Sequence, residues 1–213
     1  MTDPADDKGH RWFAFFYGAT MRMSEKRVGP LRRELLAGLT GDVLEIGAGT
    51  GGNFTHYAPE ARVIALEPDP HMLRRAQAKL AAMGATNIDV RRAPAETLPF
   101  PDNSFDAVVS TLVLCTVRDL PQSLSEIRRV LRPGGRLVFL EHVRGDGLLG
   151  GIHDVIQPVW GWCSAGCNVN RRTEDALRAA GFTPESLKHI KMSPWMPAIV
   201  GTATVGLKEP ASP

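Results

Sequence analysis

Residues 43–53 read Val43-Leu-Glu-Ile-Gly-Ala-Gly-Thr-Gly-Gly-Asn53. The first four residues are typical of a short buried strand, because the polar turn 40–42 precedes them and glycines follow. Residues 54–57 are predicted to begin a helix. In a strand–turn–helix unit, glycines let backbone N–H groups approach a ligand closely, which a side chain would prevent. The segment predicts a ligand-binding turn, although its G-x-G-x-x-G spacing from Gly47 is a weak signal by itself.

The composition indicates a single globular domain. The chain has 213 residues, of which 43% are hydrophobic and 23% charged, and its net charge is +2. So small a charge argues against a dedicated nucleic-acid-binding protein. Three cysteines are too few for a disulfide framework, which favours a cytoplasmic protein. No apolar run reaches the ~18 residues of a membrane span, and the polar N-terminus is unlike a signal peptide.

The N-terminal region divides into two parts. Residues 1–9 are predicted to be disordered and 10–213 to form one domain. Five aromatic residues crowd the start of that domain: Trp12, Phe13, Phe15, Phe16 and Tyr17. Basic residues follow them, and leucines at helical spacing predict an amphipathic helix over 30–39 with Pro30 in its first turn. Two interpretations stay open: the aromatics pack within a helical lid, 10–39, or they contact a membrane interface peripherally.

Strands and helices are expected to alternate beyond the glycines. Further strands are predicted at 61–66, 87–91, 105–110, 136–141, 186–191 and 199–207. Helices are predicted at 70–83, 121–131 and 173–180. This alternation predicts an α/β fold with a doubly wound, mostly parallel seven-stranded sheet and helices on both faces. The last two strands would form an antiparallel C-terminal edge.

Residues suited to ligand binding follow each of the first five strands. They are the glycine turn, Glu67, Ala95-Glu96, Thr111 and Glu141-His142. In such sheets ligands bind at the carboxyl ends of the strands, near the point where the strand order reverses. The five loops therefore predict one common binding site.

The identity of the ligand is suggested by three carboxylates. Glu67, twenty residues after Gly47, can accept hydrogen bonds from ribose hydroxyls of either a nicotinamide dinucleotide or S-adenosylmethionine. Glu45 suits a cationic group such as the methionine ammonium, and Ala95-Glu96 is placed to meet an adenine edge. The chain also leaves little room for the separate substrate domain of many dehydrogenases. These features favour S-adenosylmethionine.

These motifs together resemble the class I S-adenosylmethionine-dependent methyltransferases over roughly 40–141. They are Leu44-Glu-Ile-Gly-Ala-Gly-Thr-Gly51, Glu67-Pro68, Ala95-Glu-Thr-Leu-Pro-Phe100, Phe105-Asp106 and Arg129-Val-Leu-Arg-Pro-Gly-Gly135. The resemblance implies a Rossmann-like methyltransferase fold. It also implies a cofactor site made of Tyr17, Glu45, Gly47, Ala48, Gly49, Thr50, Gly51, Asn53, Glu67, Pro68, Met72, Ala95, Glu96, Thr111 and Leu112.

A narrower set of motifs is similar to the methyltransferase-like 7 group, membrane-associated enzymes that methylate thiols. The motifs are Gly51-Gly-Asn-Phe54, Glu67-Pro-Asp-Pro70, Thr111-Leu-Val-Leu-Cys-Thr-Val117, Glu141-His-Val143, Gly166-Cys-Asn-Val169 and Pro197-Ala-Ile-Val-Gly201. That group has an aspartate at the position of Glu67. It also carries an apolar N-terminal anchor, which we do not expect in this chain, so peripheral membrane contact remains an open expectation.

The resemblance implies methyl transfer to a small, apolar acceptor, most simply a thiol. Candidate catalytic residues are His142, His153 and Asp154, and 143–172 is expected to cover the substrate. Cys163 and Cys167 lack histidines nearby in sequence, so no metal site is predicted. Together with Cys115, these cysteines leave open an arsenite-type methyltransferase, which binds its substrate through thiolates.

Other acceptors and functions stay open at this point. One alternative is N-methylation of a phospholipid such as phosphatidylethanolamine, or N- or O-methylation of a small natural product. Another is a regulatory protein that binds the cofactor without catalysis. The sequence leaves the oligomeric state open.

Overall fold

The computed structural model describes residues 27–164 and 166–205. Tyr17, the other aromatics of 12–17 and the disorder expected for 1–9 lie outside the described residues. The described strands are β1 Gly41–Ile46, β2 Ala61–Leu66, β3 Ile88–Arg91, β4 Phe105–Thr111, β5 Leu131–His142, β6 Phe182–Ser193 and β7 Met196–Val205. The helices are α2 Pro70–Met83, α3 Leu120–Val130, α4 Gly147–Cys163 and α5 Thr173–Ala179, with a single 3-10 turn, η2, at Phe54–His56. Residues 27–36 are also helical.

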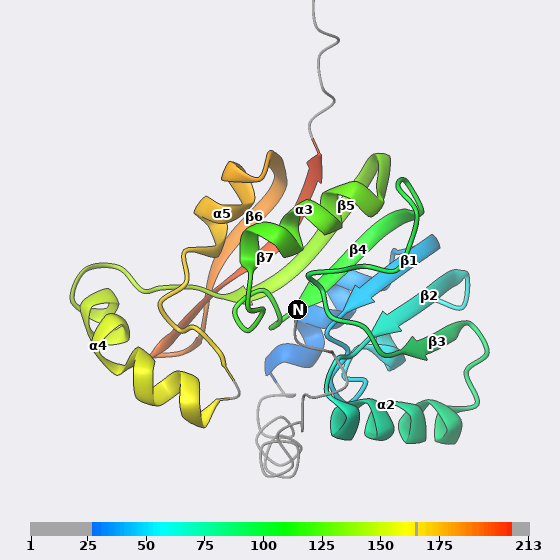
Figure 1. The fold of residues 1–213 in the computed structure, drawn as a ribbon, viewed down its shortest axis with the longest axis horizontal. Helices are drawn as coiled ribbons and strands as arrows, with labels where there is room; N and C mark the ends of the chain where they lie inside the picture. Colours follow the sequence, from blue (N-terminus) through cyan, green and yellow to red (C-terminus); the bar gives the residue numbers. More distant parts are fainter. Residues whose placement is uncertain (1–26, 165, 206–213) are drawn as a thin grey trace, which may run out of the picture.

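The strands form one seven-stranded sheet in the order β3-β2-β1-β4-β5-β7-β6 (Figure 1). β1 pairs in parallel with both β2 and β4, and β5 pairs in parallel with β4. β7 is antiparallel to both β5 and β6, which confirms the predicted C-terminal edge. The chain leaves β1 toward β2 and returns to β4 on the other side, so the strand order reverses between β1 and β4. A crevice for a ligand is expected at the carboxyl ends of these two strands.

Two layers of helix cover the sheet, because successive strand residues point to opposite faces. Leu44 of β1 belongs to the apolar cluster that also contains Leu124 of α3 and Leu177 of α5. Val43, its neighbour, belongs to the cluster formed with residues of α2 and of the helical stretch 27–36. The strands are therefore buried on both sides, which explains their nearly continuous apolar sequences.

Several predicted bounds were wrong; β6, for example, begins at Phe182 rather than at residue 186. Residues 27–29 are already helical, so Pro30 does not begin that helix, and the helical stretch ends at residue 36 rather than 39. Residues 54–57 form only the 3-10 turn η2. β5 begins at Leu131, which pairs with Phe105, before a register shift that brings Arg136 opposite Ala107.

The glycines after α3 explain the early start of β5. Gly134 has a φ of 79°, a left-handed conformation that suits glycine. Residues 133–135 therefore bulge out of β5 instead of separating α3 from the strand, while α3 itself ends at Val130.

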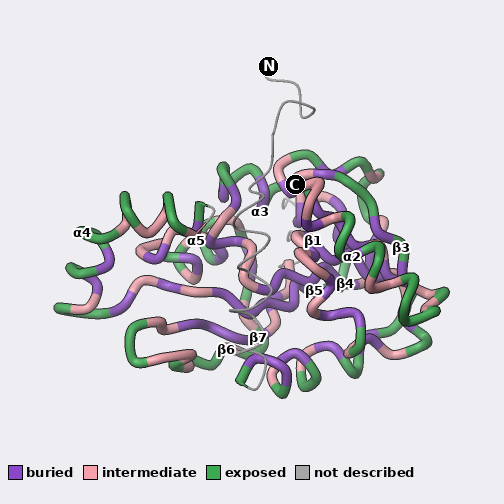
Figure 2. Tube along the Cα trace, turned by 90° about the horizontal axis from the view of Figure 1, so that it is seen from below, coloured by how far each residue is buried: buried purple, intermediate pink, exposed green. Residues whose placement is uncertain are grey.

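The apolar run 147–163, for which the sequence pattern predicts no element, forms the helix α4 with Pro158 inside it. Only Gly150 and His153 of this helix are buried. α4 lies beyond the ends of β6 and β7, at the left of Figure 1, and most of it is exposed in Figure 2. The helix thus belongs to neither of the two layers that cover the sheet.

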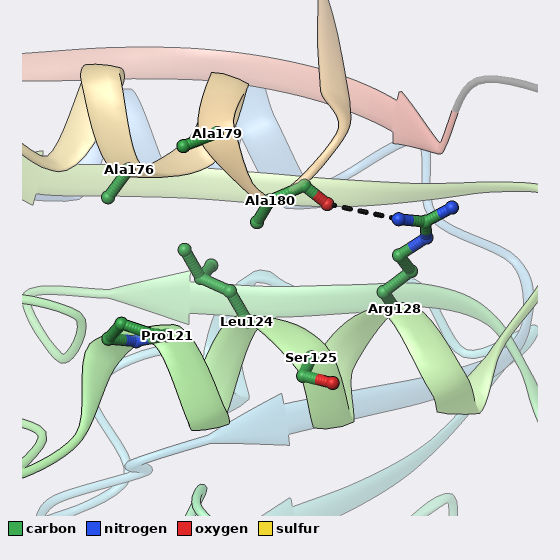
Figure 3. A pocket seen from close by; sticks show the side chains of 7 residues that line it. All are labelled: Pro121, Leu124, Ser125, Arg128, Ala176, Ala179 and Ala180. Atoms are coloured by element: carbon green, nitrogen blue, oxygen red, sulfur yellow. Dashed lines mark hydrogen bonds between the residues drawn. The ribbon is translucent and has the colours of Figure 1, made fainter.

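A hollow between α3 and α5 lies on one helical face of the sheet (Figure 3). Small and apolar side chains line most of it, and the guanidinium of Arg128 donates to the carbonyl oxygen of Ala180 across its end at 3.4 Å. None of the residues predicted to bind cofactor lines this hollow. We therefore look for the functional site at the carboxyl ends of β1 and β4.

Candidate active site

The turn after β1 has a backbone that only glycine adopts easily. Gly47, Gly49 and Gly51 have φ values of 61°, 57° and 79°. A Cβ atom on Gly47 would also overlap the side chain of Val113, and one on Gly51 would overlap Phe54. Both the conformation and the lack of space explain why this turn is glycine-rich. Its backbone can come close to a ligand, as the sequence predicts.

Glu67 joins the end of β2 to this turn. Its Oε2 accepts from the N–H of Gly49 at 2.7 Å, and its Oε1 accepts from the N–H of Asp69 at 2.8 Å. Burial raises the pKa of Glu67 to about 7, and these two backbone donors oppose that rise. Each carboxylate oxygen has a second lone pair, so ribose hydroxyls can still be accepted.

A buried polar network lies beneath the glycines. Asn53 donates through Nδ2 to Glu45 Oε1 and to Thr111 Oγ1, both at 2.9 Å, and the Tyr57 hydroxyl donates to Glu45 Oε2 at 3.0 Å. Burial raises the pKa of Glu45 to about 7. Among the described residues, Asn53 Oδ1 is a buried acceptor with no hydrogen-bond donor. An unsatisfied acceptor next to a buried carboxylate suits a cationic N–H group, such as the methionine ammonium of S-adenosylmethionine.

Arg32 is a buried cation that the sequence analysis did not assign to the site. Its side chain is 4% exposed, and a Cβ atom on Gly52 would overlap its guanidinium. Its charge lowers the pKa of Glu45, although burial and the hydrogen bonds from Tyr57 and Asn53 have larger effects on that pKa. The spacing of Leu31, Leu35 and Leu36 could have indicated a helix face that carries Arg32 toward the sheet.

The other predicted cofactor residues are dispersed around this edge. Met72 and Ala95 are buried, Pro68 is exposed, and Ala48 donates its N–H to Leu66 of β2 at 2.8 Å. The Glu96 side chain accepts from the N–H groups of Arg118 and Asp119 at 2.8 and 3.4 Å, which ties it to the start of α3. Thr50 lies half-buried in the glycine turn.

Leu112, directly after β4, has a φ of 62°. A left-handed leucine is strained by roughly 1–2 kcal/mol, and such strain is concentrated at functional sites. Its N–H donates to Leu140 at 2.7 Å, which holds the strained residue at the end of the sheet. The strain marks the turn 112–117 as part of the site.

Glu141 organises this turn, and the sequence analysis gave it no individual role. Its buried carboxylate accepts from the Ser110 hydroxyl at 2.6 Å, the Val113 N–H at 3.1 Å and the Cys115 N–H at 3.3 Å. Burial raises the pKa of Glu141, and these donors oppose the rise. A carboxylate from β5 thereby fixes the backbone that follows β4.

Residues 166–171 cover the same turn from the other side. Asn168 donates its N–H and its Nδ2 to the Cys115 carbonyl at 2.7 and 3.1 Å. The Arg171 guanidinium donates to the Leu114 and Val117 carbonyls at 2.6 and 2.9 Å. Gln157 of α4 donates to the Cys167 carbonyl at 3.2 Å, which connects the exposed helix to this segment. The segment 166–171 thus packs over the turn, while the substrate-covering role of 143–172 stays a prediction.

Cys115, His142 and Cys167 come together at the junction of these segments. Their ligand atoms all lie within 4.8 Å of one another, with Sγ–Sγ at 3.7 Å and Cys167 Sγ to His142 Nδ1 at 3.9 Å. The sequence argument that no histidine accompanies the cysteines was therefore wrong, because β5 brings His142 to them from 25 residues away. Cys163 is exposed and outside the group.

The two buried thiols have opposite pKa shifts. The hydrogen bond with Cys115 lowers the pKa of Cys167 to about 5, and His142 adds to this effect. The same hydrogen bond, followed by burial, raises the pKa of Cys115. We assign the proton to Cys115, the more deeply buried of the two, and the negative charge to Cys167 beside His142.

The other two predicted catalytic residues lie in α4. His153 is buried; its Nδ1 accepts from the Gly145 N–H, and its Nε2 donates to the Trp195 carbonyl, both at 3.1 Å. Asp154 pairs with Arg144 at 2.7 Å, and this hydrogen bond lowers the pKa of Asp154, which makes it a weak base. These contacts give both side chains a structural explanation. Their catalytic roles remain sequence-based predictions.

Comparisons with known proteins show the family to which the chain belongs. Residues 44–139 match the family model described as a methyltransferase domain. The human thiol S-methyltransferase TMT1A is 33% identical over 193 residues, which cover 85% of this chain and 79% of that protein. A phosphatidylethanolamine N-methyltransferase from Cereibacter sphaeroides is 36% identical over 50% of this chain and 53% of its own length. A solved SAM-dependent methyltransferase from Thermotoga maritima superposes with a TM-score of 0.65 at 22% identity, covering 90% of this chain and 97% of that one.

The fold, the glycine turn and these matches define a class I S-adenosylmethionine-dependent methyltransferase. S-adenosylmethionine is accordingly its cofactor, and the buried groups around Asn53 fit it. Within that class, the chain belongs to the TMT1 group. Among the described residues, no helix is both long and apolar enough to cross a membrane.

Proposed function

We propose that this enzyme transfers a methyl group from S-adenosylmethionine to the sulfur of a small, apolar thiol. The similarity to human TMT1A carries this proposal, because it covers 85% of the chain and is not limited to the methyltransferase domain at 44–139. The region beyond that domain includes His142 and the segment 166–171 that packs on the turn after β4. Acceptor specificity belongs to this region.

Several buried groups are proposed to hold the cofactor. Glu67 accepts from the ribose hydroxyls, and Ala95-Glu96 lies at the adenine. Glu45 and the unsatisfied Oδ1 of Asn53 receive the methionine ammonium. Arg32 is proposed to bind the methionine carboxylate, because a buried cation next to the glycine turn is the natural partner for that charge. We propose the other cofactor-binding residues predicted from the sequence without change.

The reaction needs alignment more than a strong base. The thiol loses its proton to solvent or to a nearby base, and the thiolate sulfur forms a bond to the methyl carbon. The carbon–sulfonium bond breaks, its electron pair stays on sulfur, and S-adenosylhomocysteine leaves. A thiol has a reference pKa of about 8.5, so its thiolate is accessible near neutral pH. Holding the two reacting groups in line can lower the barrier by about 7–11 kcal/mol.

Of the three predicted catalytic residues, His142 has the position that suits contact with the acceptor. It is the last residue of β5 and lies close to Cys115 of the turn after β4. His153 and Asp154 are occupied by the contacts that hold α4. We therefore propose that His142 helps to bind the acceptor sulfur and that the other two residues position α4.

The proposal is tested with S-adenosylmethionine labelled on its methyl group. We expect transfer to small apolar thiols, and none to their alcohol or amine counterparts of the same shape. Phosphatidylethanolamine vesicles are tested as the alternative acceptor, because the relative from Cereibacter sphaeroides is a phosphatidylethanolamine N-methyltransferase. Methylation of the lipid alone would refute the thiol acceptor. Tight binding of S-adenosylhomocysteine without transfer to any acceptor would favour a non-catalytic cofactor-binding protein.

We also propose that the enzyme contacts a membrane surface peripherally through α4. Apolar side chains repeat along its outer face at helical spacing: Leu148, Ile152, Val155, Ile156, Val159 and Trp162. Trp195, 69% exposed, lies next to α4, because its carbonyl accepts from His153 of that helix. Exposed tryptophans next to an aliphatic face are typical of helices that lie in a lipid interface, where apolar acceptors also concentrate.

Vesicle co-sedimentation tests this contact. The variant Val155→Glu/Val159→Glu should remain in solution with phosphatidylcholine vesicles that retain the wild-type protein. The matched variant Arg74→Glu/Arg75→Glu changes charge on α2, which lies on the other side of the molecule. Equal sedimentation of the wild type and both variants would refute the membrane contact. If the wild type is a dimer and the α4 variant is a monomer, the exposed face of α4 binds a second copy of the chain instead.

A further inference from the structure

We propose that Cys115, Cys167 and His142 form a binding site for a thiophilic divalent metal ion, with Zn²⁺ as its natural occupant. Two thiols and one imidazole are ligands that Zn²⁺ prefers, and three protein ligands are typical of zinc sites that leave one position open. No relative or family model described above assigns a metal to this region. The inference concerns metal binding itself and does not depend on which acceptor is methylated.

The separations of the three ligand atoms fit a tetrahedral ion. Zn–S bonds of about 2.3 Å and Zn–N bonds of about 2.0–2.1 Å place two sulfurs about 3.8 Å apart, and a sulfur and a nitrogen about 3.6 Å apart. The structure has 3.7 Å between the sulfurs and 3.9 Å between Cys167 Sγ and His142 Nδ1. The third separation is at most 4.8 Å. Where this separation exceeds about 3.6 Å, metal binding requires the half-buried His142 ring to move toward Cys115.

The surrounding hydrogen bonds hold the ligands in place without a metal. Glu141 accepts from the Cys115 N–H, and Asn168 donates twice to the Cys115 carbonyl. Gln157 binds the Cys167 carbonyl at 3.2 Å. Contacts of this kind around a metal site orient the ligands and raise its affinity. Two loops and a strand end are thus fixed around a common point before any ion binds.

The charge balance also favours a divalent cation. Two thiolates and a neutral imidazole carry a charge of −2, so a divalent ion gives a neutral complex that can be buried at low cost. Glu141 and Arg171 lie close to the cysteines with opposite charges. A second buried thiolate would not be stable there without a cation, because like charges in a low-dielectric site repel strongly.

The position of the site connects it to the reaction, and this step rests on the proposed thiol acceptor. Cys115 shares the turn 112–117 with Val113, whose side chain packs against Gly47 of the cofactor turn. The site therefore lies next to the expected position of the cofactor. Zn²⁺ binds thiolates readily, so the open fourth position suits the acceptor sulfur. Coordination would lower the pKa of the acceptor thiol, and its proton would pass to solvent before methyl transfer.

Metal titration of the full chain tests the site. The protein is stripped with a chelator under reducing conditions and titrated with Zn²⁺ against a chromophoric competitor. We expect one ion per chain. Cys115→Ser and Cys167→Ser should each weaken Zn²⁺ binding by at least about 100-fold, because the loss of a supporting contact alone weakens metal binding by about 100-fold at most. Cys163→Ser is the matched control, since Cys163 is an exposed thiol four residues from Cys167. It should bind like the wild type.

A spectroscopic readout on the wild-type protein does not depend on how the variants fold. Bound Co²⁺ should show a thiolate-to-metal charge-transfer band and the visible bands of a tetrahedral centre. Adding an apolar thiol should shift the visible bands if the acceptor occupies the fourth position. A Co²⁺ complex without the charge-transfer band, the absence of stoichiometric Zn²⁺ binding, or a disulfide between Cys115 and Cys167 in the purified protein would each overturn the proposal. None of these results bears on whether a thiol is methylated.

Discussion

The two sides of the active site are built in different ways. The cofactor side is a local arrangement: β1, its glycine turn and Glu67 at the end of β2 lie within 27 residues of sequence. The acceptor side brings together the turn after β4, the end of β5 and the segment 166–171, with Glu141, Asn168 and Arg171 as the connecting side chains. Backbone conformation defines the first side, whereas long-range side-chain hydrogen bonds define the second.

This difference predicts where substitutions act. On the cofactor side, a change should affect ligand binding directly, because the polar groups there are proposed to contact the cofactor. On the acceptor side, the loss of a connecting side chain should first affect folding stability, because buried backbone groups lose their partners. The following experiments test this distinction.

The largest effect is expected for Glu141→Ala. The substitution leaves the Ser110 hydroxyl and the N–H groups of Val113 and Cys115 without an acceptor in a buried site. Each unsatisfied group costs about 1–3 kcal/mol, so we expect a loss of about 3 kcal/mol or more, measured by urea unfolding. Glu141→Gln keeps the size and one acceptor oxygen and should lose less. Equal stability of Glu141→Ala and the wild type would contradict the connecting role.

Glu67→Ala should mainly affect the cofactor. Two hydrogen bonds to a charged acceptor, each worth roughly 1.5–3 kcal/mol, predict at least about 100-fold weaker binding of S-adenosylhomocysteine by calorimetry. Asp89→Ala is a suitable control, because Asp89 is an exposed carboxylate on the neighbouring strand β3. Unchanged affinity in Glu67→Ala would show that the ribose does not bind at this carboxylate.

The stability of the ligand-free protein should decrease as the pH rises toward 7. Burial raises the pKa of Glu45 and of Glu67 to about 7, from 4.5. A carboxyl group with a raised native pKa contributes stability below pH 4.5 that is lost as the pH rises toward 7. The free energy of unfolding of the ligand-free protein should therefore fall over this range, and it should fall less in Glu45→Gln.

Cofactor binding should have the opposite pH dependence. The ionised carboxylates are the better partners for an ammonium group and for ribose hydroxyls, so affinity for S-adenosylhomocysteine should rise about tenfold as the pH increases through 7. Calorimetry in buffers of different ionisation enthalpy would detect the released protons. Affinity that is constant between pH 6 and 8 would mean that these carboxyl groups do not ionise on binding.

The smallest effect is expected for Asp154→Asn. The pair formed with Arg144 is partly exposed, and such pairs contribute about 0–1 kcal/mol. Turnover should remain within about twofold of the wild type, because a residue that only positions α4 makes no contact with reacting atoms. A turnover about 100-fold below that of the wild type would support the catalytic role predicted from the sequence, because general acid–base catalysis contributes at least about this factor.

Predictions from the sequence are confirmed where local rules apply. The seven strands and their antiparallel edge followed from apolar runs and turn residues, and the glycine turn followed from glycines with a strand before them. They are wrong where one sequence feature is compatible with two local structures. The glycines at 134–135 suggested a helix end but form a bulge in β5, and the apolar run 147–163 gave no period that distinguished a core segment from the exposed helix α4.

By itself, the sequence determined the sheet and the glycine-rich turn, because strand periodicity and glycine conformation act over a few residues. The reaction class came from the resemblance of its motifs to a known methyltransferase family. Only the tertiary structure decided the acceptor side. Cys115 and Cys167 are 52 residues apart and meet because Glu141 and Asn168 fix their loops. Arg32 reaches the glycine turn through helix packing. Such contacts depend on how distant segments pack together in the folded chain, which a local sequence pattern does not specify.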